Sequence, residues 1–441
     1  MIINSDVVAI IADDLTGAND TALQFKLSGT DTNILLKNEI AQTSQSSSQA
    51  WAISTESRNV SPDLAFEKVK KAAELMVEKI NPDFFYKKID STVRGNIAIE
   101  VLALLEVLDW DCGLILPAFP QEGRTTVGGY HLLKGVPIER TEMARDPHSP
   151  ITESHLPTLL KKQLGEKFYD LVDTIELKTV LDGAGPVLLK LNELIAAGKK
   201  IIVADCVSTT DIEQITLAMQ KSNYKILPVG TAATAKVLSS QWFNQNSKEQ
   251  NEVFPVKLPV LPKFIVSGSA TQITANQIDK LEQIEEYEEK CLFIKLDSNT
   301  ILNGVTEELV DRIVSKLRGD NIVLVHTSNL VKDFNGITAD SIHDNITKSE
   351  FANMITNFLA ELTHRVLEKA TAILITLGGE TSFKCADAIG ANQLTLIDEV
   401  LPAIALSKNV TSDQWIVTKS GNLGGVDTLV EILKYFEKHE G

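Results

Sequence analysis

The sequence lacks several features that would assign it to familiar classes of protein. Its four cysteines are spread over 441 residues and form no CxxC pair, which argues against a zinc site or a disulfide framework. Its formal net charge of −17 has the wrong sign for a general nucleic-acid or membrane-surface binder. No apolar run approaches the roughly 20 residues that a membrane-spanning helix needs. We therefore expect a soluble cytoplasmic protein with free thiols and with neither nucleic-acid nor membrane partners.

Two common nucleotide-binding signatures are also missing. No GxxxxGK[ST] motif occurs, so any phosphate site in this chain is not a P-loop. No GxGxxG opens a helical pattern, which weakens a dinucleotide-binding interpretation. A nucleotide, if one binds, must be held by loops of another kind.

Short β-rich runs do recur along the chain, at 7–12, 84–89, 114–116 and 201–204. Most lead through a loop of small or polar residues into an apolar pattern of helical period. Such alternation predicts an α/β fold with mainly parallel sheets. In folds of this class ligands collect outside the carboxyl ends of the strands, so the residues just after each run are the candidates for function.

A break in composition divides the chain. Residues 245–262, "QNSKEQNEVFPVKLPVLP", are first polar and then punctuated by proline, which is typical of a linker. The β-rich pattern restarts beyond it. We therefore predict an N-terminal α/β domain at 1–244, a linker at 245–262 and a C-terminal α/β domain at 263–441, with the active site in a cleft between the domains.

The first strand-end loop carries two adjacent acids, Asp13 and Asp14. One of them could simply cap the helix that follows while the other is solvated, because capping needs a single carboxylate. Alternatively, the pair works in a site, where two close carboxylates coordinate magnesium, bind the hydroxyls of a substrate or accept a proton. The sequence leaves both interpretations open.

Two further loops in the N-terminal half add cations and hydroxyls. "KKIDSTVRGN" (87–96) ends a strand at Asp90, with Ser91 next and Arg94 four residues after the acid. Arginine suits the bidentate binding of a carboxylate or phosphate, although a local Asp90–Arg94 ion pair is the simpler alternative. Arg124 lies in the glycine-bounded loop "FPQEGRTTVGG", which we expect to be irregular. Together these loops predict a cleft for a small, anionic, hydroxylated ligand.

The C-terminal half contains three glycine-containing strand-end loops: "SGS" (267–269), "LGGETS" (377–382) and "KSGNLGG" (419–425). Glycine lets backbone amides approach an anion closely, and a helix N-terminus adds a favourable dipole. Lys419 supplies a positive charge beside the third loop. Any one of these loops could be an ordinary turn, but three in one domain favour a phosphate-binding site.

Taken in order, these segments resemble the four-carbon acid sugar kinase family. The resemblance rests on "IADDLTGA", "KKIDSTVRGN", "LPAFPQEGRTTVGGYHLLKGVPIERTEMARDP", "VSGS", "LGGETS" and "KSGNLGG", which span nearly the whole chain. It implies an N-terminal domain that binds a sugar acid and a C-terminal domain that binds ATP with Mg²⁺, with no metal ligands identified. The reaction would be phosphorylation of the C4 hydroxyl of an erythronate, threonate or 3-oxo-tetronate type of acid.

The resemblance also distributes the candidate residues between two sites. The sugar-acid site would contain Asp13, Asp14, Lys88, Asp90, Ser91, Arg94 and Arg124. The nucleotide site would contain Ser267, Gly268, Ser269, Gly378, Gly379, Glu380, Thr381, Lys419 and Gly421.

For the chemistry, we expect Arg94 or Arg124 to hold the carboxylate of the acid. An aspartate, Asp14 first and Asp90 second, would accept the proton of the attacking hydroxyl. Two adjacent carboxylates that face each other would raise one pKa and so help a base. The residues do not choose between the two aspartates.

Three alternatives remain at this point. A haloacid-dehalogenase-like phosphatase would need an acid two residues after its nucleophile, where this sequence has Leu15 or Thr16. A non-catalytic sensor of sugar acids would share the binding loops, and a kinase of the same family could act on another small hydroxy acid. For assembly, the sequence offers only the general preference of oligomeric proteins for homodimers.

Overall fold

The computed structural model describes residues 6–40, 48–145, 149–243, 257–319, 321–328, 330 and 346–440. The chain divides into two compact units, the first made of Met1–Asn38 and Gln45–Glu249 and the second of Glu39–Ser44 and Gln250–Gly441. Residues 245–256 of the predicted linker lie outside the described residues. The predicted limits of the domains stay a prediction, and each unit is described here by itself.

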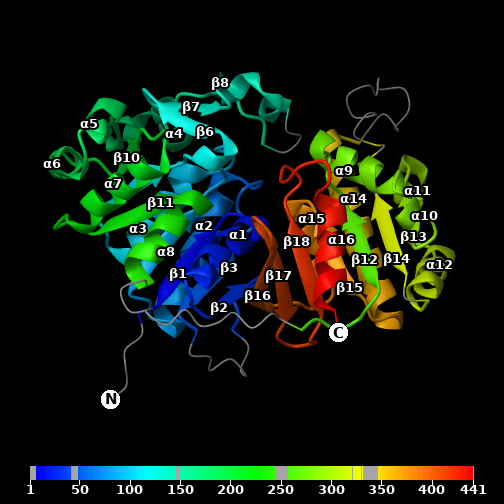
Figure 1. The fold of residues 1–441 in the computed structure, drawn as a ribbon. Coiled ribbons are helices and arrows are strands. Elements are labelled where there is room, and N and C mark those ends of the chain that lie inside the picture. The colour runs from blue at the N-terminus through cyan, green and yellow to red at the C-terminus, as the bar shows by residue number, and fades with distance from the viewer. Residues whose placement is uncertain are drawn as a thin grey trace, which may run out of the picture. The chain divides into compact units, whose positions relative to one another are not determined.

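The first unit is built on a parallel sheet with the strand order β2-β3-β1-β4-β11-β5-β10-β9 (Figure 1). Each neighbouring pair in that order is parallel. The strands are β1 (Val8–Ala12), β2 (Thr32–Leu35), β3 (Ala50–Ser54), β4 (Phe84–Lys88), β5 (Cys112–Leu116), β9 (Val172–Ile175), β10 (Ile201–Ala204) and β11 (Ile226–Gly230). The run "VAIIA" of β1 is buried throughout, as expected for a strand covered on both faces.

Helices pack on both faces of this sheet. Helices α1 and α8 contact each other, as do α2 and α3, and α6 and α7. Their bounds are α1 (Leu15–Leu27), α2 (Pro62–Lys79), α3 (Ile97–Leu108), α4 (Leu156–Leu164), α5 (Leu177–Leu181), α6 (Ala184–Ala196), α7 (Thr209–Gln220) and α8 (Ala232–Phe243). Four 3₁₀ turns complete the set: η1 (Pro120–Glu122), η2 (Ile138–Arg140), η3 (Glu142–Arg145) and η4 (Glu166–Leu171).

The loop that we expected to be irregular contains a small antiparallel sheet instead. Its strands are β6 (Arg124–Val127), β7 (Tyr130–Leu133) and β8 (Val136–Pro137). Gly128 and Gly129 join β6 to β7 with φ angles of 58° and 75°. Two residues of positive φ form the tight turn that suits the twist of a hairpin. The paired glycines were the signal for this hairpin in the sequence.

The second unit has a mixed sheet with the order β13-β14-β12-β15-β18-β17-β16. The pairs from β13 to β18 are parallel, whereas β17 runs antiparallel to both of its neighbours. The strands are β12 (Lys263–Ser267), β13 (Cys291–Lys295), β14 (Ile322–His326), β15 (Ile373–Leu377), β16 (Gln393–Leu401), β17 (Ile404–Asn409) and β18 (Trp415–Lys419). The prediction of an α/β fold with mainly parallel sheets is thus confirmed.

The helices of the second unit cover the two faces of its sheet. Helix α9 (Gln272–Glu282) contacts α10 (Glu285–Glu288) and α16 (Thr428–His439). Helix α14 (Lys348–Lys369) contacts α11 (Ser298–Asn303), α12 (Glu307–Leu317) and α15 (Gly379–Ala388). The described helices include none that is long and apolar enough to cross a membrane.

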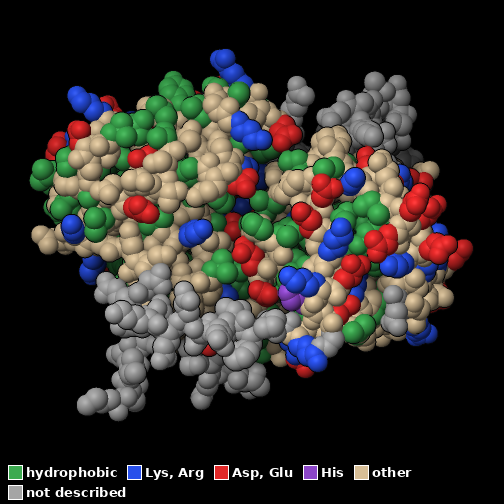
Figure 2. All heavy atoms as spheres, in the orientation of Figure 1, with side chains coloured by type: hydrophobic (Ala, Val, Ile, Leu, Met, Phe, Trp, Pro, Cys, Tyr) green, Lys and Arg blue, Asp and Glu red, His purple; other side chains and the backbone are tan. Residues whose placement is uncertain are grey.

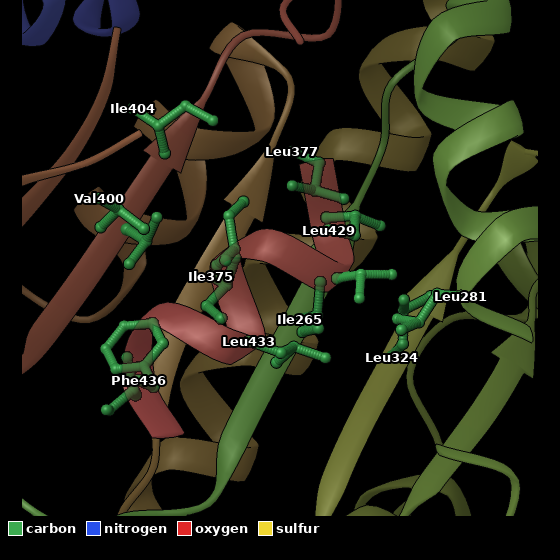
Figure 3. Close-up of a cluster of buried hydrophobic side chains, with 14 of the residues drawn as sticks. Ile265, Leu281, Leu324, Ile375, Leu377, Val400, Ile404, Leu429, Leu433 and Phe436 are labelled. Carbon is green, nitrogen blue, oxygen red and sulfur yellow. The ribbon is translucent and has the colours of Figure 1, made fainter. Parts of the chain in front are cut away.

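One hydrophobic core cluster of the second unit lies between its sheet and helices α9 and α16 (Figure 3). Ile265, Leu324 and Ile375 come from neighbouring strands and pack with Leu433 and Phe436 of α16. Full burial of such a side chain contributes on the order of 1.5–3 kcal/mol. Because side chains on one face of a strand recur every second residue, this apolar layer fixes which face the last residues of the strands present.

Acidic and basic side chains are interspersed on the face drawn in Figure 2, most densely over the unit that carries α9 to α12. The excess of negative charge is therefore spread over the described surface of that face rather than gathered in one patch. Mixed charge of this kind does not select a strongly charged polymer as a partner.

Candidate active site

The carboxyl ends of three neighbouring strands bring the acidic loops of the first unit together. Ala12, the last residue of β1, is in register with Ser54 of β3 and with Lys88 of β4. The residues that follow these strands therefore leave the sheet side by side. This places the loops beginning at Asp13 and at Ile89 at one edge, as the sequence predicted.

Asp14 is the N-cap of α1. Its Oδ1 accepts a hydrogen bond from the backbone nitrogen of Gly17 at 2.8 Å, and its Oδ2 accepts one from the hydroxyl of Thr16 at 2.9 Å. A cap of this kind satisfies a helix N–H that has no partner within the helix. Asp14 is thus the helix cap, but the other half of the capping interpretation is wrong, because Asp13 is buried rather than solvated.

Arg58 binds both members of the acidic pair, and the sequence analysis missed it. Its Nε and Nη2 donate to the two carboxylate oxygens of Asp13 at 2.8 and 3.0 Å. Its Nη1 donates to Oδ2 of Asp14 at 2.7 Å, and Nη2 lies 3.8 Å from Oδ1 of Asp90. Three acids from two separate loops therefore surround a single guanidinium.

Arg94 forms a second bidentate pair, with Asp90. Its Nε and Nη2 donate to Oδ2 and Oδ1 of Asp90 at 2.8 and 3.1 Å, and the hydroxyl of Thr92 donates to the same carboxylate. This is the local ion pair that the sequence left as the simpler alternative. A ligand carboxylate at Arg94 would have to share the guanidinium with Asp90.

These contacts set the protonation of the acids. Burial opposes the ionisation of Asp13, but the charge and hydrogen bonds of Arg58 outweigh burial and hold the pKa of Asp13 below its usual value. Burial likewise opposes the ionisation of Asp90, yet Arg94 and Arg58 hold its pKa well below the usual value. The adjacency of Asp13 and Asp14 does not raise the pKa of Asp13, because Arg58 binds both carboxylates and its positive charge outweighs their repulsion.

Glu56 is a further acid at this edge that the sequence analysis did not single out. It follows β3, and its Oε1 accepts hydrogen bonds from the backbone nitrogen of Leu15 at 2.9 Å and from the hydroxyl of Ser54 at 2.6 Å. Burial, with the nearby charge of Asp14, raises the pKa of Glu56 to about 8. Its protonation therefore differs from that of Asp13 and Asp90 at neutral pH.

Two buried lysines end strand β4. Lys87 is fully buried and pairs with Glu100 of α3 at 2.7 Å. Lys88, the predicted site residue, donates from Nζ to the carbonyl of Ile89 at 2.9 Å. Both ammonium groups thus lie beneath the acidic loops and offset part of their negative charge.

Ser91 and Arg124 lie beside the same loop but make different contacts. His131 of β7 bonds through Nε2 to the carbonyl of Ser91 at 2.9 Å, and burial lowers the pKa of His131 to about 4. Arg124 binds Glu122 at 3.1 Å, and its charge contributes to the low pKa of His131. The structure therefore brings Asp13, Asp14 and Asp90 together around Arg58, whereas Arg124 forms its ion pair with Glu122.

A pocket of about 280 Å³ opens against both guanidinium groups of the site. It is lined by Arg58, Asn59, Val60, Val93, Arg94, Gly95, Asn96, Ser149, Pro150, Ile151, Thr152, Leu159 and Gln163. Among the described residues, the lining contains two arginines, several amides and hydroxyls, and no carboxylate. Its size and its chemistry suit a small polar anion.

In the second unit, four parallel strands end at one level. Ser267 of β12 is in register with His326 of β14 and with Leu377 of β15, which is itself in register with Lys419 of β18. Ser267 and Lys419 each follow an apolar core residue by two positions, so they share the face that packs on α9 and α16. The predicted loops at 267–269, 377–382 and 419–425 therefore start side by side.

Close packing explains the glycines of these loops. Gly378 has a φ of 112°, which only glycine adopts without strain, and it is the N-cap of α15, which begins at Gly379. A Cβ on Gly268 would lie 2.5 Å from the hydroxyl oxygen of Thr381. A Cβ on Gly421 would collide with the hydroxyl of Ser269. Gly268 and Gly421 thus lie where a side chain of a neighbouring loop leaves no room for a Cβ.

The charged groups of this edge differ in exposure. Lys419 is fully buried, and burial lowers its pKa to about 7; its Nζ donates to the carbonyl of Ser420 at 2.9 Å. Glu380, in the first turn of α15, forms an ion pair with Lys384 at 3.2 Å. Lys384 is therefore a cation beside the predicted nucleotide site that the motifs did not include.

His326 is a buried group that the sequence reasoning also missed. Its Nδ1 bonds with the hydroxyl of Ser328 at 2.6 Å, and burial lowers its pKa to about 4. Among the described residues, neither its Nε2 nor the buried hydroxyl oxygen of Ser267 has a hydrogen-bond partner, and Oε1 of Glu282 lies 3.6 Å from that Nε2. His326 lies beside "SGS" because β12 and β14 pair with Ser267 and His326 in register. That pairing joins two distant segments, so neither segment alone predicts it.

The described residues contain no cluster of three or more histidine, cysteine, aspartate or glutamate side chains arranged to hold a metal ion. All four cysteines are free and buried. A magnesium ion that arrives with a nucleotide needs only one or two protein carboxylates, since phosphates and water fill its other positions. The acids of the first unit are chemically suited to that limited role.

Comparison with known proteins agrees with this division of the chain. Residues 8–238 match the family model of a sugar-binding N-terminal domain, and residues 264–429 match that of a nucleotide-binding C-terminal domain. The chain is 30% identical to a D-threonate kinase from Salmonella typhimurium, over 97% of this chain and 98% of that relative. It is 28% identical to a D-erythronate kinase from Heliobacterium modesticaldum, over 97% and 96% respectively.

Two further matches come from Haemophilus influenzae. A 3-oxo-tetronate kinase is 26% identical, over 96% of this chain and 98% of that relative. A crystal structure superposes with a TM-score of 0.70 at 24% identity, covering 97% of this chain and 100% of that one. At this identity the structural likeness establishes the fold alone.

The fold and the two loop clusters define a two-domain α/β protein with a sugar-binding and a nucleotide-binding half. The chain belongs to the four-carbon acid sugar kinase family. The resemblance inferred from the motifs is thereby confirmed, while the roles of the individual site residues stay predictions.

Proposed function

We propose that this protein is an ATP-dependent kinase that phosphorylates the C4 hydroxyl of a four-carbon sugar acid. The carrying observation is the group of Asp13, Asp14 and Asp90 around Arg58, next to a pocket lined by Arg58 and Arg94. Carboxylates accept hydrogen bonds from the hydroxyls of a sugar acid, while guanidinium groups bind its carboxylate. A site with both kinds of group suits a ligand that carries both hydroxyls and a negative charge.

In this proposal the second unit supplies the phosphoryl donor. The loops at 267–269, 377–382 and 419–425 converge on the N-terminus of α15, where backbone amides and the helix dipole favour phosphate. Lys419 adds a titratable ammonium group at the same edge. Mg²⁺ would accompany ATP and neutralise its phosphates, as phosphoryl transfer generally requires.

D-erythronate, D-threonate and 3-oxo-tetronate are the acids named for the relatives, and we propose a substrate from this group. A kinase for another small hydroxy acid is the alternative, because one or two hydrogen-bonding groups decide between such acids. We propose a cytoplasmic location, which the four free, buried cysteines support. A homodimer is the default assembly to test.

An ADP-release assay tests the reaction and the substrate together. Purified protein, Mg²⁺ and ATP are incubated with the erythronates, threonates and 3-oxo-tetronate, with five- and six-carbon sugar acids as controls. We expect turnover with one four-carbon acid and little with the longer acids. Turnover with the longer acids alone would support a kinase but contradict the four-carbon substrate. No ADP release with any of the acids would contradict the proposed function.

One substitution tests the proposed nucleotide site, and a second variant serves as its control. Gly378→Val should weaken ATP binding at least tenfold, because a β-branched residue is strained at a φ of 112°, and it should leave binding of the acid nearly unchanged. Arg312→Ala is the matched control, since Arg312 is an exposed residue of α12 in the same unit and lies outside the three glycine-containing loops. Normal ATP affinity in a folded Gly378→Val protein would contradict the assignment of the nucleotide site.

A further inference from the structure

Glu56 differs from the other acids at the sugar-acid edge in having no cationic partner. Asp13, Asp14, Asp90 and Glu100 each lie within 3.0 Å of an arginine or lysine nitrogen. Among the described residues, no such nitrogen pairs with the carboxylate of Glu56, whose bonds go to one backbone N–H and one hydroxyl. A carboxylate that is not held by a cation retains more of its basicity.

The side chain of Glu56 is nevertheless fixed in position. Its backbone has a left-handed φ of 45°, and its carbonyl accepts a hydrogen bond from Nζ of Lys68 at 3.1 Å. Both of its side-chain hydrogen bonds end on Oε1, one from the first residue of α1 and one from Ser54. Oε2 has no hydrogen-bond partner among the described residues, and Glu56 is half-buried, so this oxygen is available to accept a further hydrogen bond.

The other acids are less suitable as proton acceptors. Both oxygens of Asp13 are occupied by Arg58, and both oxygens of Asp90 by Arg94. Both oxygens of Asp14 are occupied as well, by Gly17 on one side and by Arg58 and Thr16 on the other. Arg58 and Arg94 also hold the pKa values of Asp13 and Asp90 below their usual values, so these two carboxylates are weaker proton acceptors than Glu56.

We propose that Oε2 of Glu56 accepts the proton of the C4 hydroxyl of the sugar acid during phosphoryl transfer. As the proton moves to Glu56, the C4 oxygen forms a bond to the γ-phosphorus of ATP. The bond from that phosphorus to the bridging oxygen breaks, its electron pair leaves with ADP, and Glu56 later releases the proton to solvent. This inference rests on the proposed function and replaces Asp14 and Asp90 in the role of base.

The charges around Glu56 give this step a pH dependence. Asp14 of the α1 N-terminus raises the pKa of Glu56, Arg58 lowers it, and Lys68 of α2 faces its backbone carbonyl. Burial is the largest influence, and the resulting pKa is about 8. Since only the ionised carboxylate accepts a proton, turnover should rise with pH and level off above about pH 8.

The test is the pH profile of kcat between pH 6 and 9.5 for wild-type protein, Glu56→Gln and Glu56→Asp. Glutamine keeps a side-chain oxygen that accepts from Leu15 and Ser54, so the fold should be retained, as a melting curve would show. We expect Glu56→Gln to lower kcat by about 100-fold or more, with little change in KM and a flat pH profile. Glu56→Asp should keep a rising profile at reduced rate.

Glu106→Gln is the matched control, because Glu106 is a partly exposed acid of α3 that binds Lys70 at the surface. Its kinetics should equal those of the wild type. If Glu56→Gln retains more than a third of wild-type kcat, or keeps the rising limb, Glu56 is not the base. If instead the wild-type protein releases no ADP with any acid, the proposed function fails and this inference falls with it.

Discussion

Replacing Arg58 with alanine would test whether one guanidinium holds the acidic edge of the first unit together. The substitution removes three hydrogen bonds of 2.7–3.0 Å to Asp13 and Asp14. The two aspartates are only 3% and 7% exposed, so water cannot readily replace the lost partner. Their negative charges would then lie side by side without the cation between them.

The expected loss of stability follows from that burial. Removing one partner of a buried ion pair typically costs about 3–5 kcal/mol, since the remaining charge stays desolvated. Three charge-assisted hydrogen bonds are lost together here, so we expect a decrease of about 3–5 kcal/mol in the free energy of unfolding at pH 7.5. A decrease of that size is a large fraction of the roughly 5–15 kcal/mol by which a folded domain is stable.

The loss should shrink in acid. In the wild type the pKa of Asp13 is depressed in the folded state, so its stabilising contribution is present above the unfolded pKa and is lost only as pH falls through the folded pKa. Without Arg58, burial would raise the folded pKa of Asp13 above the unfolded value. The resulting penalty would diminish as the pH falls below that raised pKa, so the variant should lie closer to the wild type in stability at pH 4.5 than at pH 7.5, while the wild type still keeps the contribution of ionised Asp13.

Urea unfolding at pH 7.5 and 4.5 measures this effect, with Arg140→Ala as the exposed control in the same unit. Tryptophan fluorescence is a suitable signal, because Trp51, Trp110 and Trp242 lie in the first unit. Adding Asp13→Asn to Arg58→Ala should restore part of the stability by removing one unpaired charge. A loss below about 1 kcal/mol at pH 7.5, or an equal loss at both pH values, would refute the reasoning.

Two further predictions concern the buried lysines. Lys87→Met should destabilise the protein by about 3–5 kcal/mol at pH 7.5, because Glu100 remains buried without its partner, and replacing both residues with apolar ones should recover most of the loss in urea unfolding. Lys419 should make ATP binding weaker as the pH rises from 6.5 to 8.5, since burial lowers its free pKa to about 7 and phosphate favours the charged form. Calorimetry in buffers of different ionisation enthalpy should show proton uptake, and a pH-independent affinity would mean that Lys419 does not contact phosphate.

The sequence was sufficient for the architecture because each element carried its own local signal. The apolar run "VAIIA" predicted β1, and apolar residues at helical spacing predicted α3, which the structure places at Ile97–Leu108. Ser208 and Asp211, spaced three residues apart, form a capping box at the start of α7. The hairpin of β6 and β7 was missed because its residues are mostly polar and its turn signal, two glycines, is shared with ordinary loops.

The sequence was less informative about the site, since contacts between distant loops have no local signature. Asp13, Asp14 and Asp90 stood out because they follow strand-like runs directly, and Arg94 stood out because it comes four residues after Asp90. Arg58 comes from the loop after β3, four residues beyond the strand, and nothing nearby in the chain indicates three carboxylate partners. Its importance depends on the strand order β3-β1-β4, which brings its loop beside both acidic loops.

The arrangement also explains how an acidic protein could bind an acid. Three aspartates and two arginines in the cluster leave a net charge of −1 at neutral pH, and the ammonium group of Lys88 beneath them offsets that charge. A carboxylate ligand therefore meets a nearly neutral edge rather than the field of a chain with a net charge of −17. Because both guanidinium groups already bind aspartates, attraction by charge alone cannot give tight binding here. Selectivity at this edge should come instead from how many ligand hydroxyls the fixed carboxylates can accept, which is the property that distinguishes one four-carbon acid from another.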